Sequence, residues 1–404
     1  MASLVPLLLS PLFLLAQQGL TPEDAVRLAL EQNAYLAGSA SRITVAEGLR
    51  TQAGLKPNPR LFLQSENARI PVPAPMKFWT DTDSFSYVSQ VFETNGKRQR
   101  RVDVASENVR GAELTLALQK AQVASRVLGA YWSAVGAERL ASVLGESLKV
   151  LDQTVEFQRL RVKEGALPEA DLTRVLLEYQ QVAITYQNAQ QDARRLLLLL
   201  YREMGLPQES RATLRGDLAA VAAIALPDVD AAVENRADVR LSAQAVQQAQ
   251  ATVRLQRANA RPDPEVLFGY KRTLGFNTVV AGVQINLPVR NKNQGAIAAA
   301  AADSTAAAAD LRATRMAAKT EIEALLGEYQ QKRDLVQQML PTLREQANLT
   351  RRIADAVYRE GASDLLRLLD AERVRIQTET LYVQSLIQYR LSAINLQTAL
   401  GQLP

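Results

Sequence analysis

The stretch Tyr358–Glu372, YREGASDLLRLLDAE, has an earlier counterpart at Val162–Tyr179, VKEGALPEADLTRVLLEY. Each contains a Glu-Gly-Ala break between two long runs of helix-forming residues, and an Asp opens the second run. Glycine readily adopts the left-handed conformation that ends many helices, and Asp is a preferred residue at the start of the next helix. The two stretches therefore predict two helical hairpins with similar tips.

These hairpin tips belong to a longer internal repeat. Glu164 and Glu360 are 196 residues apart (360 − 164), and Gly205 and Gly401, which follow the next helical runs, are also 196 apart (401 − 205). Three further pairs recur in the same order: Gln90 and Gln284, Lys56–Pro59 and Arg261–Pro264, and Glu31 and Glu234. Ordered landmarks at a nearly fixed period indicate a duplicated unit. We predict a first repeat over 18–215 and a second over 216–404.

The sequence of each repeat predicts a helix, two strands and two long helices, in that order. The elements expected in the first repeat are a helix from Thr21 to about Ala53, a hairpin at 60–93 with strands 60–66 and 84–93, and long helices at 96–203. Those of the second are a hairpin at 265–287 with strands 265–271 and 277–287, and long helices at 294–400 with a kink at Pro341. A helix over 96–163 would be about 100 Å long, too long for the core of one globule. The fold class is therefore mainly α with a small β part, in which long helices pack side by side in a bundle or tube that includes other subunits.

The last predicted strand alternates in polarity. Val279, Ala281, Val283, Ile285 and Leu287 point to one side, and mostly small or polar residues point to the other. This alternation is typical of a strand between lipid and water. A hairpin packed on the core of a soluble protein would show the same pattern, so this strand alone leaves both readings open.

The residue types present exclude several kinds of function. The chain has no Cys and no His, which excludes disulfides, thiol chemistry, the usual zinc sites and His-based acid–base catalysis. No constellation of the remaining reactive side chains stands out, so we expect no enzyme, no cofactor and no metal site. The net charge of +5 is small and its Lys and Arg are interleaved with acids, so no nucleic-acid surface is expected.

The N-terminus and the hydropathy pattern bear on location. An apolar run from Leu4 to Ala16 is too short to span a bilayer and predicts a signal peptide over residues 1–17, with a buried N-terminal segment as the alternative. No later segment offers the run of about 18 apolar residues that indicates a transmembrane helix.

The second helix of each tip has a charged face and an apolar face. Asp364, Arg367 and Asp370 share one side of the helix, and four leucines between Leu365 and Leu369 share the other. In the first repeat, Asp171 and Arg174 lie on one face in the same way. The leucines indicate core packing. The charges indicate either a solvated surface or a functional site.

Four strands per chain impose a constraint, because a closed barrel needs about eight strands. Strand edges cannot face lipid unpaired, so strands in a membrane must be supplied jointly by several chains. The element order and the motifs VSQVFETNGKRQR, VKEGALPEADL and YREGASDLLRLLDAE, together with the ending LGQLP, resemble the TolC family of outer-membrane efflux proteins. The likeness is strongest to the heavy-metal-resistance branch of CzcC-type channels and covers essentially the whole mature chain.

This resemblance implies a homotrimer with a twelve-stranded transmembrane β-barrel, four strands per chain, joined to a long α-helical coiled-coil barrel that crosses the periplasm. It implies an outer-membrane location in a Gram-negative-type cell, contact with outer-membrane lipid, and two partners: a periplasmic adaptor and an inner-membrane pump of the RND type. The adaptor would dock at the hairpin tips, Glu164, Gly165, Ala166, Glu360, Gly361 and Ala362.

The periplasmic entrance would lie just after Gly361. The family commonly has two acidic residues there, three positions apart; here Asp370 is the second, but Arg367 occupies the first. Candidate gate residues are Asp370, Arg367, Asp364, Asp171 and Arg174. The expected function is a passive exit duct for metal cations or drugs. The alternatives are a periplasmic coiled-coil adaptor without a pore and a channel for type I protein secretion.

Overall fold

The computed structural model describes residues 19–68, 75, 77, 81–207, 213–225 and 228–403, and the predicted signal peptide lies outside this part of the chain. The chain divides into two compact units, each built from segments of both halves of the sequence. We call the first the helical unit; it comprises Met1–Gly38, Ala117–Ala237 and Met316–Pro404. The second, the sheet unit, comprises Ser39–Leu116 and Asp238–Arg315.

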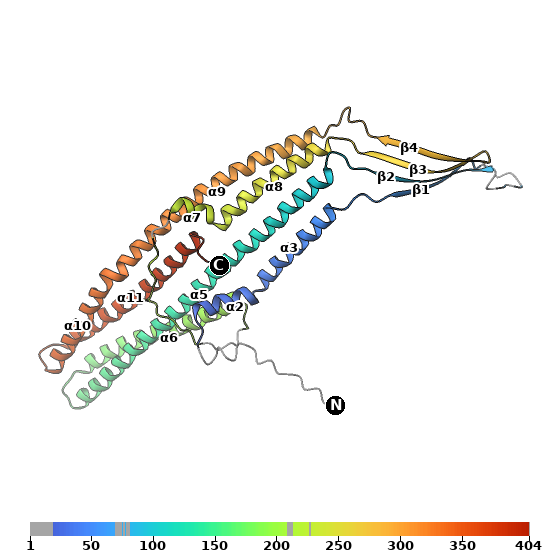
Figure 1. Ribbon diagram of the computed structural model, residues 1–404. Helices are drawn as coiled ribbons and strands as arrows, with labels where there is room; N and C mark the ends of the chain where they lie inside the picture. Colours follow the sequence, from blue (N-terminus) through green and yellow to red (C-terminus); the bar gives the residue numbers. More distant parts are fainter. Residues whose placement is uncertain are drawn as a thin grey trace, which may run out of the picture. The chain divides into compact units, whose positions relative to one another are not determined.

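The sheet unit contains one antiparallel sheet in the order β1-β2-β3-β4 (Figure 1). Its strands are β1 (Arg60–Glu66), β2 (Asp83–Val91), β3 (Pro264–Thr273) and β4 (Phe276–Ile285). The bounds differ from the sequence expectation by at most two residues. The central pairing joins β2 from the first half of the chain to β3 from the second, with Tyr87 opposite Gly269.

Helices adjoin the sheet in the same unit. They are α3 (Ala34–Ala53), α8 (Ala237–Asn259), the first turns of α5 (Lys97–Lys163) and the first half of α9 (Gln294–Asp334). Lys97 is buried at the start of α5, and its Nζ lies 2.7 Å from the carboxylate of Asp263, just before β3. The same carboxylate accepts a hydrogen bond from the backbone N–H of Thr94. These contacts attach the end of the first hairpin to the start of the second.

The helix predicted from Thr21 to Ala53 is interrupted, and this expectation was wrong. Thr21 caps α2 (Pro22–Gln32) as predicted, but Asn33 adopts an extended conformation before α3. The side-chain Oδ1 of Asn33 accepts a hydrogen bond from the Tyr35 N–H. The side-chain Nδ2 donates to the backbone carbonyl of Glu203 in α6. Asn33 therefore caps the second helix and ties the break to a distant element, which is a tertiary contact that periodicity does not reveal.

The kink predicted at Pro341 takes the form of a change in helix type. A π-helical segment, η1 (Leu335–Met339), separates α9 from α10 (Leu340–Arg359), and Pro341 lies in the first turn of α10. Proline has no N–H to donate, and its ring clashes with the carbonyl four residues earlier. The wider turn ahead of Pro341 accommodates that clash without ending the helix.

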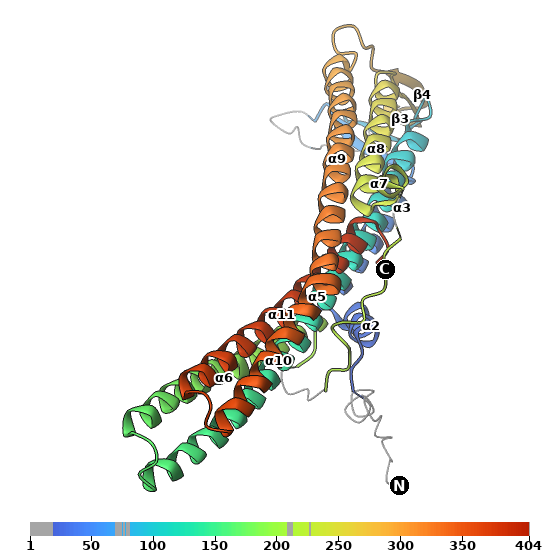
Figure 2. The ribbon, with the colours of Figure 1, turned by 90° about the vertical axis from the view of Figure 1, so that its left-hand side faces the viewer.

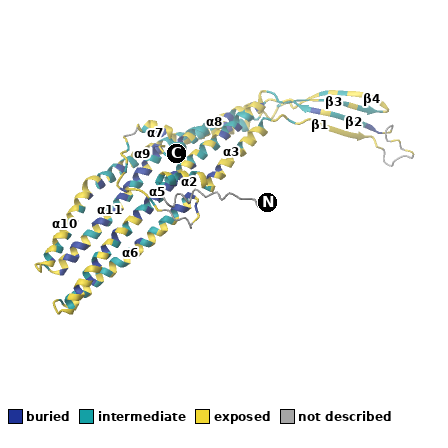
Figure 3. Ribbon diagram, turned by 60° about the horizontal axis from the view of Figure 1, so that its bottom comes forward, coloured by how far each residue is buried: buried dark blue, intermediate teal, exposed yellow. Residues whose placement is uncertain are grey.

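Two helical hairpins lie side by side in the helical unit (Figure 2). One consists of the later part of α5 with α6 (Glu169–Met204), and the other of α10 with α11 (Leu365–Ala399); α7 (Val229–Asn235) is a short additional helix. Buried residues recur along their facing sides (Figure 3). Four tyrosines are among the most completely buried side chains: Tyr131, Tyr201, Tyr329 and Tyr389.

An extended segment, 213–225, is fastened to these helices. The Tyr131 hydroxyl donates to the Leu20 carbonyl at 2.7 Å and accepts from the Arg215 N–H at 3.0 Å. Arg390 lies 3.9 Å from the centre of the Trp132 ring and donates to the carbonyls of Leu218 and Ala220. Burial lowers the pKa of Arg390 and raises that of Tyr131 to about 12.

No helix in the described ranges combines the length and the apolarity that a membrane-crossing helix requires.

Candidate functional site

The two tips, 164–168 and 360–364, have the same backbone structure. Gly165 and Gly361 have φ angles of 72° and 74°, in the left-handed region. The N–H of Gly165 donates to the Val162 carbonyl, and that of Gly361 donates to the Tyr358 carbonyl, both at 3.0 Å. The N–H of each following Ala donates to a carbonyl five residues earlier, Arg161 or Val357, and completes a Schellman motif. The predicted tips are therefore confirmed as helix ends, and all six proposed docking residues are exposed: Glu164, Gly165, Ala166, Glu360, Gly361 and Ala362.

The helices that leave the tips begin differently. Asp364 caps α11, and its carboxylate accepts a hydrogen bond from the Arg367 N–H at 3.1 Å. In the first tip, Pro168 occupies the cap position and makes no side-chain bond. Asp171 does not open α6, contrary to the sequence expectation; it lies in the first turn, because Pro168 fixes the entry into the helix two residues earlier.

The candidate gate residues are exposed apart from Asp171, which is half-buried. Neither Arg367 nor Asp370 forms an ion pair within the described part of the chain. The hydrogen bond to the Glu178 carboxylate raises the pKa of Arg373, and the nearby charge of Asp370 adds a smaller contribution in the same direction. The gate side chains of a single chain are therefore available for contacts with another molecule.

Opposite charges occupy matching positions in the two tips. The 196-residue shift places Asp171 at the position of Arg367 (367 − 171 = 196) and Arg174 at the position of Asp370 (370 − 174 = 196). Helices α6 and α11 of one chain lie next to each other in space, because Arg373 of α11 forms an ion pair with Glu178 of α6. The same faces of neighbouring helices thus carry Asp-Arg in one tip and Arg-Asp in the other.

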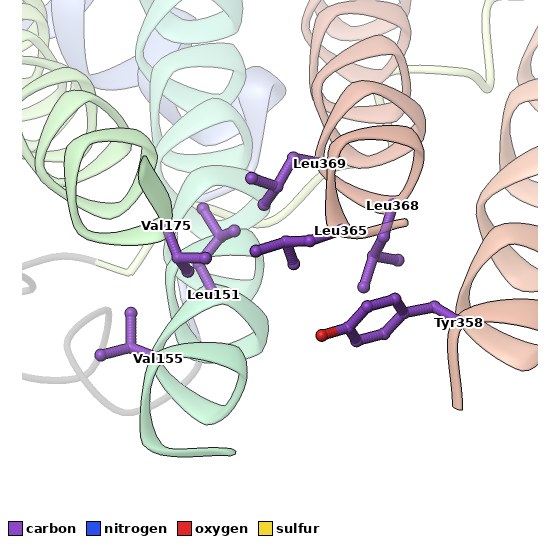
Figure 4. Packing of buried hydrophobic residues seen from close by; sticks show 7 residues of the cluster. All are labelled: Leu151, Val155, Val175, Tyr358, Leu365, Leu368 and Leu369. Atoms are coloured by element: carbon purple, nitrogen blue, oxygen red, sulfur yellow. The ribbon is translucent and has the colours of Figure 1, made fainter. Parts of the chain in front are cut away.

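The apolar faces pack together behind the tips (Figure 4). Leu365, Leu368 and Leu369 of α11 are buried and meet Val175 of α6. The remaining members of the cluster are Leu151, Val155 and Tyr358. The expectation that the leucines form core is confirmed for these three. It was wrong for Leu366, which is 53% exposed, because the packed side of α11 does not extend to that position. Four helix ends are held together by this cluster.

A buried hydrogen-bond chain links the two hairpins, and sequence reasoning missed it. The Tyr358 hydroxyl donates to the Gln158 side-chain oxygen at 3.0 Å and accepts from Arg161 at 2.9 Å. Gln158 is fully buried, and its amide nitrogen has no partner in the described structure. Tyr358 opens the quoted motif, so a polar aromatic residue one turn before the glycine was the available signal.

Two buried acids anchor α11, and these were also missed. Glu372 accepts from Arg351 at 3.1 Å and from Arg375 at 2.6 Å. Farther along the helix, Glu379 pairs with Arg344 at 2.7 Å and holds the pKa of that guanidinium above its usual range. Acids at these positions could have been recognised from the many arginines of α10, but their burial depends on the packing of two helices.

The sheet has one apolar face and one polar face. The apolar face is exposed to the surroundings of the chain: Phe268 is 64% exposed, Val279 70% and Val283 63%. The same face is polar at the end of the sheet near the β3–β4 turn. There Ser84 lies opposite Arg272, and Arg272 lies opposite Asn277. The apolar side of β4 therefore does not pack on a core of this chain, and of the two sequence readings the soluble-core one is wrong.

The exposed apolar residues form a band along the strands. On β4 it runs from Ile285 to Val279, which corresponds to about 20 Å at 3.3 Å per residue. Neither β1 nor β4 has a second strand partner among the described residues, so both sheet edges are open.

No group of His, Cys, Asp and Glu among the described residues is arranged to hold a metal ion.

Comparisons with known proteins place this fold. The sequence model of the outer membrane efflux protein family matches residues 229–402. The cobalt-zinc-cadmium resistance protein CzcC of Cupriavidus metallidurans is 25% identical over 389 residues, which cover 95% of this chain and 90% of that protein.

Solved structures of outer-membrane channels superpose on nearly the whole chain. The CusC channel superposes with a TM-score of 0.80 at 16% identity and covers 94% of this chain and 92% of its own. The open state of the MtrE outer membrane channel of Neisseria gonorrhoeae gives 0.79 at 16% identity, with 94% and 88% covered. The resemblance drawn from the sequence motifs is thereby confirmed: residues 229–402 match the outer membrane efflux protein family, and nearly the whole chain has the fold of these outer-membrane channels.

Proposed function

We propose that this protein is a homotrimeric exit duct through which an inner-membrane pump of the RND type drives substrates across the outer membrane. The observation that carries the proposal is the sheet, whose exposed apolar face adjoins two open edges. Open edges in lipid cost several kcal/mol per unsatisfied backbone group, so they must be paired. Three chains, with β4 of each beside β1 of the next, would close a barrel of twelve strands.

The experiment compares the two faces of β4. Val283→Arg places a charge on the apolar face, and Thr278→Arg is the matched change on the polar face. A charge facing lipid near the bilayer midplane costs about 2–4 kcal/mol in a barrel strand. We expect heat-modifiable trimers in outer-membrane fractions to be lost with Val283→Arg and retained with Thr278→Arg. Equal amounts of trimer from both variants would contradict the proposal.

The entrance is proposed to lie at the second tip and to be closed by charge pairs between tips. In a ring of alternating tips, Asp171 would face Arg367 and Arg174 would face Asp370 of a neighbouring chain. Support comes from the matching positions of opposite sign and from the lack of ion pairs for Arg367 and Asp370 within the described chain. Asp364 would serve by fixing the start of α11.

The adaptor is proposed to dock at both tips of each chain. Their backbones are equivalent, and nothing lies within 4 Å of the Cβ position at Gly165 or at Gly361, so both tips offer open surface. Ala362→Trp would add bulk to an exposed tip, and Ala362→Ser is the mild control. Loss of co-purification with the adaptor in the first variant alone is expected; unchanged capture by both would refute docking at the tip.

The two-repeat organisation, 18–215 and 216–404, is part of the proposal. The sheet unit supports it, because its two segments, Ser39–Leu116 and Asp238–Arg315, both contain 78 residues (116 − 39 + 1 and 315 − 238 + 1). Corresponding segments of the chain thus occupy the same unit.

The substrate class rests on the relative named for cobalt, zinc and cadmium resistance. We propose divalent metal cations as cargo, with drugs as the second candidate. In a wide duct the pump would select the substrate, so the chain would need no His or Cys ligands. Deletion of the gene should lower cellular tolerance of cobalt, zinc or cadmium salts. Unchanged tolerance of all three, together with lowered tolerance of organic toxicants, would favour the second candidate.

A further inference from the structure

The polar face of the sheet carries an aromatic pair that a duct for hydrated ions does not require. Phe62 of β1 and Tyr87 of β2 are opposite each other, with ring centroids 4.6 Å apart and planes inclined by 25°. Phe62 is 40% exposed although it lies on the side that carries Arg60 and Gln64. Stacked aromatic rings on a solvent-facing sheet surface offer a platform for a further planar ring.

On the side away from Phe62, the cross-strand partner of Tyr87 has no side chain. Its partner on β3 is Gly269, and a Cβ at that position would lie 2.3 Å from the Tyr87 Cβ and 2.4 Å from its Cα. Any larger residue would therefore force the strands apart. Because Gly269 has no side chain, the sheet surface between Tyr87 and the half-buried Val280 of β4 is formed by backbone.

The ammonium group of Lys271 lies on the same face of the sheet, opposite Phe85. The Lys271 Nζ is 4.8 Å from the centre of the Phe85 ring, and these two residues are partners in the register. Phe85 is two residues from Tyr87 on β2, a separation of about 7 Å. In the described structure Lys271 has no acidic partner, whereas Arg60 on the other side of the stack is paired with Glu265. Positive charge beside the stack is thus free to attract an anion.

We infer that Phe62, Tyr87 and Lys271 form a binding site for planar aromatic anions, such as aromatic carboxylates or sulfonates. The ring of the ligand stacks on the aromatic pair, and its acid group lies toward the Lys271 ammonium. This inference rests on the proposed function, because the polar face lines the duct only if the sheets of several chains close around it. The duct then retains aromatic acids as well as passing metal cations.

The test measures fluorescence anisotropy of 2-naphthalenesulfonate on titration with purified protein in detergent, with detergent alone subtracted. We expect binding to weaken at least tenfold in Phe62→Ser and in Lys271→Gln. Phe268→Ser, the matched change on the apolar face, should leave it unaltered. Phe62→Leu replaces Phe62→Ser if the latter does not assemble, since it keeps an apolar side chain and removes only stacking.

A cation of the same shape, 2-naphthylmethylammonium, should bind at least tenfold more weakly than the sulfonate. Equal binding of the two probes, or binding of the sulfonate that is unchanged in Phe62→Leu and Lys271→Gln, would overturn the assignment. Sedimentation of the same samples reports the trimer separately. A trimer without naphthalenesulfonate binding would refute this site alone, and a monomer would refute the proposed function.

Discussion

The two hairpin tips share a backbone and differ in what holds them. Both end a helix with glycine in the left-handed conformation and the same pair of hydrogen bonds. The second tip is followed by a helix with an Asp cap and two buried acids, Glu372 and Glu379, each paired with arginines. The first tip has a proline cap and continues an unbroken α5, whereas the second follows a helix interrupted by η1.

The two hairpins therefore differ in what supports them. The first hairpin keeps a continuous helix of 67 residues, α5, as its long arm. The long arm of the second is interrupted at η1, and side-chain links along α11 hold that hairpin. Loss of such links should therefore affect the second hairpin more than equivalent changes affect the first.

The largest effect is expected for Glu372→Ala. Its carboxylate is 4% exposed and lies against the half-buried Arg351 and Arg375, so its removal takes a carboxylate partner from both guanidinium groups and leaves Arg375 its hydrogen bond to Ser147. Breaking a buried pair in this way costs about 3–5 kcal/mol. The control is Glu178→Ala, whose partner Arg373 is largely exposed and whose loss should cost less than about 1 kcal/mol. Denaturant unfolding followed by circular dichroism gives both values; equal losses would contradict the buried anchor.

Leu368→Ala ranks next. Leu368 is buried in the tip cluster, and its counterpart in the first hairpin is the half-buried Leu172 (368 − 172 = 196). Truncation of a buried leucine costs about 2–5 kcal/mol, and a partly exposed one costs less. The unfolding midpoint should fall more for Leu368→Ala than for Leu172→Ala. The reverse order would show that the cluster is not the centre of packing at the tips.

Tyr358→Phe should have a smaller effect. The change removes the hydroxyl that bonds Gln158 and Arg161 and leaves the ring in place. A buried amide left unsatisfied costs about 1–3 kcal/mol. Tyr179→Phe, on a half-buried ring beside the same cluster, is the control. Cleavage near residues 158–161 by a protease should be faster in the first variant only, and identical cleavage of both would argue against a link between hairpins.

The smallest effects, and nearly equal ones, are expected for Gly165→Ala and Gly361→Ala. Neither position has a neighbour within 4 Å of an added Cβ, so only the left-handed backbone opposes the substitution. That conformation costs about 1–2 kcal/mol for a residue other than glycine. Matching shifts in the unfolding midpoint would confirm that the tips are equivalent in backbone. A loss confined to one tip would show that the other relaxes into a different turn.

Local chemistry explains which features the sequence revealed. Glycine at the tips, alternation in β4 and the capping Thr21 act within a few residues, so their structural outcome could be predicted. The break at Asn33 and the burial of Glu372 depend on partners far along the chain, Glu203 and Arg351, and no local pattern predicts them. Among the candidate site residues, the cap at Asp364 follows from the sequence, whereas the Tyr358 link requires knowledge of which helices meet.

We propose that oppositely charged tips close the entrance of an outer-membrane duct, and single-channel conductance in planar bilayers tests this proposal. Arg367→Asp should raise the conductance above that of the parent protein, because it replaces a pair with a repulsion. Adding Asp171→Arg should restore the pair and return the conductance to the parent level. A conductance in Arg367→Asp no greater than the parent's, or a double variant as open as the single one, would show that these charges do not close the entrance.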